Sequence, residues 1–216
     1  MSNLERFMND KSVSDLDPII KMAIIHHQFE SIHPFSDGNG RTGRIINILY
    51  LVQQGLLDLP VLYLSKYIIR NKAKYYELLQ NVRDNNVWES WVLFMLRGVE
   101  ETSIETISLI GEVKELMKDY KSDIRTNLRK IYSQDLLNNL FRHPYTKIKF
   151  LMAELNVSRL TATSYLNHLE ERGLVTKLKI GNENFYINYK LYDLLMNAFH
   201  IDSTIVDSID SRANLY

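Results

Sequence analysis

The chain of 216 residues has no cysteine, only four prolines and eight glycines, and no net charge. Without cysteine it has no disulfides, no zinc site built on thiolates and no thiol nucleophile. The 26 basic residues balance the 26 acidic ones, so bulk charge gives no case for a nucleic acid or a membrane surface as partner. No run approaches the roughly 18 apolar residues of a membrane-spanning helix, and the first residues lack an apolar segment of signal-peptide length. We therefore expect a cytoplasmic protein without a membrane partner.

The scarcity of glycine and proline, together with long stretches of helical periodicity, predicts a mainly α protein. Asp17 followed by Pro18 is a typical helix start and predicts a helix over residues 17–31. The next helix is expected over residues 41–54, and its many apolar residues favour burial on most sides. A long helical pattern then covers residues 88–119.

The pattern after about residue 130 predicts three short helices followed by a β-hairpin. We expect the helices over residues 135–141, 146–155 and 159–172, and the strands over residues 174–180 and 185–188. Ser158 is well placed to cap the third helix. This order of elements resembles a winged helix-turn-helix, in which residues 159–169 form the candidate recognition helix.

The most informative segment runs from His33 to Arg44 and reads HPFSDGNGRTGR. Its glycines let the backbone turn with successive N–H groups facing one concavity, which suits phosphate oxygens. Arg41 and Arg44 offer guanidinium forks that match phosphate, Asp37 offers an oxygen ligand for Mg²⁺, and His33 can accept a proton near neutral pH. A helix that starts near Arg41 would direct its positive N-terminal end at the same anion.

This segment fills every fixed position of the Fic family signature, and the chain resembles that family over about residues 1–105. The resemblance includes residues 27–32 before the loop and residues 62–65 and 75–76 after it. It implies a Fic-type helical bundle followed by a small winged helix-turn-helix (α+β) domain. It also implies a nucleotidyltransferase, more closely a protein adenylyltransferase, that transfers AMP from ATP with Mg²⁺ to a Ser, Thr or Tyr hydroxyl of a protein. The chain itself is one candidate target.

By this resemblance His33 is the general base and Asp37 holds Mg²⁺. The resemblance assigns the nucleotide to the rest of the loop and to two tyrosines, namely Gly38, Asn39, Gly40, Arg41, Thr42, Gly43, Arg44, Tyr75 and Tyr76. The Asn39 amide is expected to face the phosphates, Arg44 to contact the γ-phosphate, and Tyr76 to line the base pocket.

The neighbouring residues allow simpler interpretations. Phe35 is expected to point away from the ligand as an apolar plug that fixes the loop in the core. His26 and His27 favour core packing over metal binding, because magnesium prefers oxygen ligands. Glu30 is left open between orienting the base, pairing with an arginine and lying on a solvated face. Ser65 is a candidate N-cap of a short helix.

Four regions are expected along the chain: a Fic core over 1–110, a connecting helix over 111–134, a winged helix over 135–200 and a polar tail over 201–216. DNA contact by the third region would use Arg159, Thr161, Thr163, Ser164 and Tyr165. Protein docking is favoured instead, because the recognition helix and wing carry few basic residues. The alternative function of the chain is a regulatory DNA- or protein-binding module with a vestigial nucleotide-binding Fic domain.

Relatives with this motif usually carry a longer N-terminal part, which includes a β-hairpin flap that holds the target and often an inhibitory helix with a Ser/Thr-x-x-x-Glu motif. Neither element is readable before residue 17. The resemblance therefore implies that Arg44 lacks an internal glutamate partner unless a second copy or another chain supplies one. We expect nucleotide binding more firmly than full activity of this chain alone.

Overall fold

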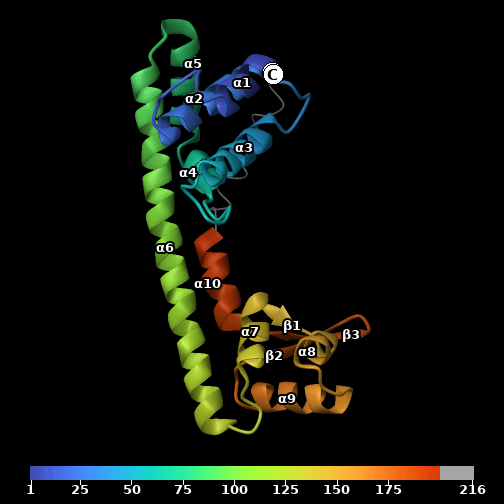
Figure 1. The fold of residues 1–216 in the computed structure, drawn as a ribbon. Coiled ribbons are helices and arrows are strands. Elements are labelled where there is room, and N and C mark those ends of the chain that lie inside the picture. Colours follow the sequence, from blue (N-terminus) through green and yellow to red (C-terminus); the bar gives the residue numbers. More distant parts are fainter. Residues whose placement is uncertain (200–216) are drawn as a thin grey trace. The chain divides into compact units, whose positions relative to one another are not determined.

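The computed structural model describes residues 1–199, so the polar tail expected over 201–216 lies outside the described residues. The described residues form two compact units, Met1–Thr106 and 107–199. The border between them falls inside the long helix α6 (Trp88–Asn127), drawn in green in Figure 1. Most described residues are helical, which confirms the mainly α prediction. Over residues 1–199, no helix combines the length and apolar character that crossing a membrane requires.

The first unit is a helical bundle around one hydrophobic core. Its helices are α1 (Ser2–Asn9), α2 (Pro18–Ile32), α3 (Asn39–Gln53), α4 (Leu64–Arg70), α5 (Lys72–Asn85) and the first part of α6. α2 is buried along most of its length, and the indole N–H of Trp91 in α6 donates a hydrogen bond to the Ala23 carbonyl at 2.9 Å. Asp17 caps α2 as predicted, accepting the Ile19 N–H at 2.8 Å. The central helix is thus fixed at its start and middle, and it ends at His33.

α3 packs beside α2 and differs from its prediction in two ways. It begins at Asn39 rather than Arg41, because Gly38 turns the chain in the left-handed region (φ 87°) directly before it. Burial on most sides was also wrong, since Ile45 and Leu49 are 56% and 55% exposed. Because of this earlier start, the first turn of α3 falls within the segment from His33 to Arg44.

α6 is longer than the sequence indicates. The prediction ended a helix near residue 119 and expected a connecting helix over 111–134, but one continuous helix ends at Asn127. Tyr120 and Ile124 are 1% and 0% exposed in the core of the second unit, and this packing continues the helix past Gly111.

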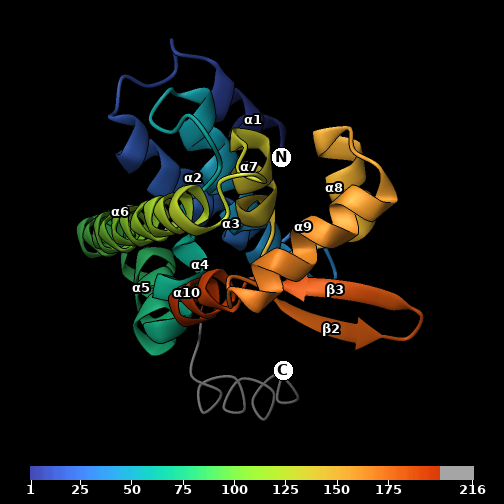
Figure 2. The ribbon, with the colours of Figure 1, turned by 90° about the horizontal axis from the view of Figure 1, so that it is seen from below.

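The second unit combines four further helices with a small antiparallel sheet. The helices are α7 (Gln134–Arg142), α8 (Ile148–Leu155), α9 (Arg159–Glu171) and α10 (Tyr189–Phe199), and the strands are β1 (Tyr145–Thr146), β2 (Thr176–Ile180) and β3 (Glu183–Ile187). The strand order is β1-β3-β2, with Thr176 opposite Ile187 and Ile180 opposite Glu183. Figure 2 shows the β2–β3 hairpin in orange beside α9.

The predicted order of three helices and a hairpin is confirmed, and Ser158 caps α9 by accepting the Thr161 N–H at 3.1 Å. The sequence interpretation missed β1, which has only two residues, and α10. Asn188 caps α10 by accepting the Leu191 N–H at 3.1 Å, but the sequence interpretation assigned it to the end of the preceding strand. A hydrophobic cluster that includes Leu136, Leu166 and Tyr186 forms the core of this unit. Each unit therefore has a core of its own.

Candidate functional site

A cleft of about 580 Å³ opens in the first unit over the loop between α2 and α3. Its volume lies in the range of roughly 300–1,000 Å³ that is common for small-molecule sites. It is lined by Glu30, His33, Ser36, Asp37, Gly38, Asn39, Gly40, Arg41, Arg44, Ile68, Ile69, Lys72, Tyr75, Tyr76, Leu79 and Arg83. Arginine and lysine side chains outnumber the two carboxylates in this lining. The cleft therefore favours an anionic ligand.

His33 closes α2 in an unusual backbone conformation. Its φ and ψ are 49° and 57°, in the left-handed region that a side chain disfavours, and its N–H donates to the Phe29 carbonyl at 3.0 Å. Such a conformation persists only where the surrounding structure imposes it, and it is frequent at functional sites. The buried helix α2 thus delivers the exposed imidazole of His33 to the cleft.

Asn39 braces the loop with its side chain, contrary to the prediction that its amide faces the phosphates. The amide oxygen accepts the Phe35 N–H at 2.9 Å, and the amide nitrogen donates to the Phe35 carbonyl at 2.6 Å. Phe35 is not the buried plug that the sequence predicted, because its side chain is 49% exposed with its ring centroid 6.3 Å from that of Phe29. The loop is held mainly through these backbone groups.

The backbone at the start of α3 keeps donors for an anion. Thr42 N–H donates to the Gly38 carbonyl at 3.0 Å and closes the first turn. The N–H groups of the residues before Thr42 have no partner inside the helix, as in any first helical turn. Gly40 fits closely, because a Cβ there would lie 3.2 Å from Nη1 of Arg44. This end of α3 therefore favours an anion.

The two arginines of the loop are held in different ways. Arg41 donates from Nη2 to Oδ2 of Asp37 at 3.0 Å, and both side chains are largely exposed. Oδ1 of Asp37 accepts the Gly38 N–H at 2.6 Å. Arg44, in contrast, donates from Nε to the Ser65 hydroxyl of α4 at 2.8 Å, so its position depends on another helix. Ser65 lies inside α4 and does not cap it, which corrects the prediction.

Glu30 lies in the cleft wall, which excludes the solvated face among the three interpretations that the sequence left open. Its side chain is 8% exposed, and a Cβ on Gly43 would lie 2.8 Å from its Oε1. Burial raises the pKa of Glu30, while the charges of Arg44, His33 and Arg83 oppose that rise. Glu30 is thus a buried carboxylate of the cleft wall, and its Oε1 has no hydrogen-bond partner within the described part of the chain.

The tyrosine pair has one buried and one accessible member. Tyr75 is 4% exposed, its hydroxyl lies 3.0 Å from Nε2 of His26, and burial raises the pKa of Tyr75. Tyr76 is 56% exposed and stands edge-on to Tyr75, with 5.2 Å between the ring centroids. His26 and His27 are 0% and 4% exposed in the core, as expected.

The structure brings most of the predicted site residues together along this cleft. Thr42 and Gly43 are not in its lining, because the Thr42 hydroxyl donates to the Gly38 carbonyl and Gly43 is buried. The sequence interpretation missed the α5 face made by Lys72, Leu79 and Arg83. These residues recur with Tyr76 at the spacing of one helical face, and this periodicity was the available signal.

The lining also bears on metal binding. Among residues 1–199, no group of three or more His, Cys, Asp or Glu side chains is placed to hold a metal ion. Asp37 is the carboxylate on the exposed side of the loop, next to the first turn of α3. This donor set suits Mg²⁺, which often takes one carboxylate from the protein and its other ligands from phosphates and water.

Two family models match the chain. Residues 1–51 match the Fic/DOC family, and residues 116–191 match the C-terminal domain of SoFic-like protein adenylyltransferases. A probable protein adenylyltransferase of Aquifex aeolicus (strain VF5) is 30% identical over 193 residues, which are 89% of this chain and 53% of that protein. The protein adenylyltransferase Fic of Drosophila melanogaster is 31% identical over 102 residues, 47% of this chain and 19% of that protein.

The chain thus spans about half the length of the Aquifex relative and less of the fly protein. Among solved structures, a Fic family protein from Desulfovibrio desulfuricans G20 is 22% identical with a TM-score of 0.46. That alignment covers 86% of this chain and 53% of the other, and the superposition is too loose to add to the argument.

Proposed function

We propose that the chain, whose residues 1–51 match the Fic/DOC family, is a protein adenylyltransferase, which moves AMP from ATP to a Ser, Thr or Tyr hydroxyl of a protein. The observation that carries this proposal is the convergence of His33, the first turn of α3 and Arg44 on one cationic cleft. Transfer of a nucleotide to a hydroxyl requires a general base, backbone donors for the phosphates and a fixed guanidinium.

The triphosphate would lie across the start of α3. Its oxygens would accept from the first-turn N–H groups, with Arg41 and Arg44 neutralising the charge that spreads onto the leaving pyrophosphate. The backbone N–H groups and Arg44 stand in fixed positions before the reaction, which is the arrangement that lowers a barrier most. The apolar surface that Tyr76, Ile68 and Ile69 provide in the same cleft would contact the adenine ring.

His33 would take the proton of the target hydroxyl. The hydroxyl oxygen forms a bond to the α-phosphorus, and the bond from that phosphorus to the oxygen that bridges the α- and β-phosphates breaks. The electron pair of the broken bond stays on that oxygen, which leaves as part of pyrophosphate. General-base assistance of this kind contributes roughly 10²–10⁴-fold to a rate. The fixed backbone at the end of α2 orients the ring for this step.

Asp37 would hold Mg²⁺ beside the phosphates. Its carboxylate is exposed and pairs with Arg41, so nucleotide binding would exchange this ion pair for two new ones, Arg41 to phosphate and Asp37 to the metal. The ion would supply charge neutralisation on the phosphate oxygens. The exchange costs little, because an exposed ion pair contributes only about 0–1 kcal/mol.

For the second unit we propose a winged helix that docks protein and does not read DNA. Glu183 of the wing pairs with Lys147 and Lys149 at the start of α8, the latter at 3.1 Å, so basic side chains beside the wing are partly neutralised. Leu160 at the start of α9 is 85% exposed, and an apolar side chain there suits a protein surface better than a phosphate backbone. A target protein, a second copy or an inhibitory chain are the classes of partner that such a module would hold.

The test is a comparison of wild type with His33→Ala in a cell lysate supplied with ATP and Mg²⁺. Mass spectrometry should find Ser, Thr or Tyr residues that carry one AMP only in the wild-type reaction, on a target or on the chain itself. Identical AMP modification by the variant would refute His33 as the base, and absence of any modification by the wild type would refute transferase activity of this chain.

A further inference from the structure

α4 is too short to keep its position alone. It has seven residues, Leu64–Arg70, and no side chain caps its first turn. An isolated helix of that length is unstable, since helices below roughly 12 residues are marginal in water. Its place in the first unit therefore depends on the contacts that dock it on its neighbours.

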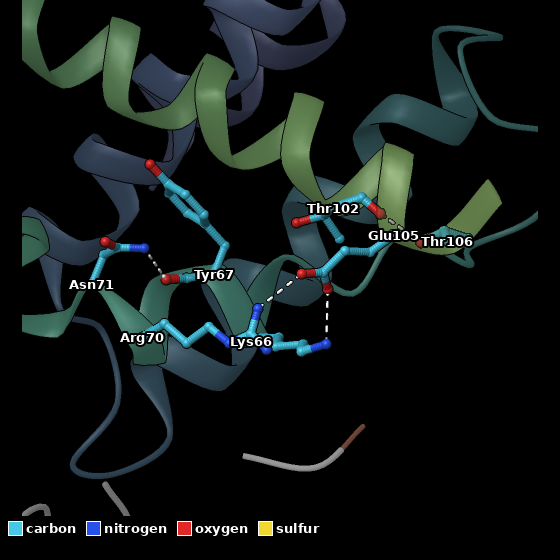
Figure 3. Close-up of polar contacts among 7 residues, drawn as sticks. All are labelled: Lys66, Tyr67, Arg70, Asn71, Thr102, Glu105 and Thr106. Carbon is cyan, nitrogen blue, oxygen red and sulfur yellow. Dashed lines mark hydrogen bonds and ion pairs between the residues drawn. The ribbon is translucent and has the colours of Figure 1, made fainter. Parts of the chain in front are cut away.

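One of these contacts is a polar clamp, by which we mean Glu105 of α6 with Lys66 and Arg70 of α4. Figure 3 shows the Glu105 carboxylate between the two cations. Nζ of Lys66 donates to Oε2 at 2.8 Å and Nη1 of Arg70 donates to Oε1 at 2.8 Å. The hydrogen bond from Lys66 lowers the pKa of Glu105, so the carboxylate is charged at neutral pH. The Lys66 side chain is only 11% exposed, which limits screening by water.

A second contact is a close approach of α4 to α6 at Gly98. A Cβ there would lie 2.6 Å from Cδ1 of Tyr67 and 3.1 Å from Cδ1 of Leu64. Tyr67 and Leu64 are 9% and 1% exposed in the core. The apolar face of α4 thus packs against α6 at Gly98, and the polar clamp joins the two helices about two turns further along α6.

Ser65 links the docked helix α4 to Arg44 in the cleft. Its hydroxyl accepts a hydrogen bond from Nε of Arg44 at 2.8 Å. A guanidinium held at Nε keeps its two terminal nitrogens free to form a fork on a phosphate. Ile68 and Ile69 of the same helix line the cleft, so α4 sets two parts of the site at once.

We propose that Ser65 is a positioning residue for Arg44, and that the polar clamp holds α4 where Ser65 meets this guanidinium. The proposal rests on the proposed function for its ligand, a nucleoside triphosphate whose distal phosphate Arg44 contacts. It adds two elements outside the signature loop, Ser65 and Glu105, to the machinery that recognises the third phosphate.

The first experiment measures the affinities of the variants for ATP and ADP by calorimetry. Ser65→Ala should weaken ATP binding about three- to tenfold, as expected for one lost hydrogen bond, and leave ADP binding unchanged. Glu105→Gln should lower the ATP-to-ADP affinity ratio by a smaller factor. Glu101→Gln removes a charge one turn earlier on α6 and should leave the ratio as in wild type. In an Arg44→Ala background, Ser65→Ala should change nothing further.

The second experiment needs no nucleotide. The Nε–H group of Arg44 gives a ¹H–¹⁵N signal, which Arg44→Lys identifies by removing it. Its exchange with water should accelerate several-fold in Ser65→Ala and also in Glu105→Gln, but not in Glu101→Gln. Alanine is a better helix former than serine, so Ser65→Ala should fold normally, and circular dichroism checks this.

The outcomes separate this proposal from the proposed function. Unchanged Arg44 exchange in Ser65→Ala overturns the positioning role, whether or not AMP is transferred, and so does an ATP-to-ADP ratio that does not change. If exchange accelerates but the wild type binds no ATP or transfers no AMP, the positioning of Arg44 stands and only the proposed function fails.

Discussion

Single residues of the loop divide into those whose side chains face the cleft and those that hold the loop in shape. Asn39 belongs to the second kind, because its buried amide makes two hydrogen bonds to the backbone of Phe35. His26 and Tyr75 hold each other behind the accessible ring of Tyr76. The signature therefore encodes a folded loop as much as a list of ligand contacts.

Asn39→Ala should destabilise the first unit by about 1–3 kcal/mol, because it removes two part-buried hydrogen bonds to the Phe35 backbone, each of which contributes about 0.5–1.5 kcal/mol. Asn85→Ala is the control, since Asn85 is exposed and its amide bonds only Asn81 within α5. Urea unfolding measures both. An Asn39→Ala variant as stable as Asn85→Ala would show that the brace contributes nothing.

His26 predicts a pH dependence of stability. Burial lowers the pKa of His26 to about 4 from its usual 6.5, so the unfolded chain binds this proton more readily than the folded one. The free energy of unfolding should therefore fall by about 3 kcal/mol as pH drops from about 6.5 to about 4. Burial also lowers the pKa of His27, which adds in the same direction.

Urea unfolding at intervals over that pH range measures this loss. His26→Gln, which has no titrating ring, should show a smaller slope than wild type. If both proteins lose stability equally over this range, the buried His26 is not the cause.

At the scale of elements, α4 and α6 show how tightly a functional helix is docked. Gly98→Ala should destabilise the protein by about 1–3 kcal/mol, because the added methyl group meets the Tyr67 ring at 2.6 Å. Gly111→Ala on the same helix is the matched control, with nothing within 4 Å of its Cβ. There alanine should stabilise by up to about 1 kcal/mol through helix propensity. Thermal unfolding shifts of the same sign in both variants would contradict the close approach.

Prediction from sequence succeeded where a local signal determines an element. Asp17 with Pro18 and Ser158 marked real helix starts, and the hairpin followed from alternation around Gly181. Prediction failed where the end of an element is set by packing against residues far away in the sequence. The end of α6 depends on Tyr120 and Ile124 in the second core, which no local pattern reveals.

The candidate site divides in the same way. The loop from 33 to 44 was readable because its residue types are chemically specific. Glu30 and Ser65 were not, because each acquires its place only when α2 and α4 come together around the cleft, whereas the helical spacing of Arg83 was a signal that the interpretation missed.

At the scale of the whole molecule, the two units have separate cores, and the division into a Fic core and a second domain stays a prediction. Both tryptophans, Trp88 and Trp91, lie in the first unit, so tryptophan fluorescence reports on that unit alone. Leu166→Ala empties a fully buried position of the second core and should cost that unit about 2–5 kcal/mol. Circular dichroism should detect this loss in urea, while the fluorescence transition stays in place. An equal shift of the fluorescence transition would mean that the units unfold as one.

The central claim is that the loop from His33 to Arg44 transfers a nucleotide and not a phosphate alone. Parallel incubations of the protein with ATP labelled at the α- or the γ-phosphate, each beside His33→Ala, test it most directly. The account predicts label on protein from α-labelled ATP only, and its loss in His33→Ala. Protein label from γ-labelled ATP, or α-label that His33→Ala retains, would contradict it.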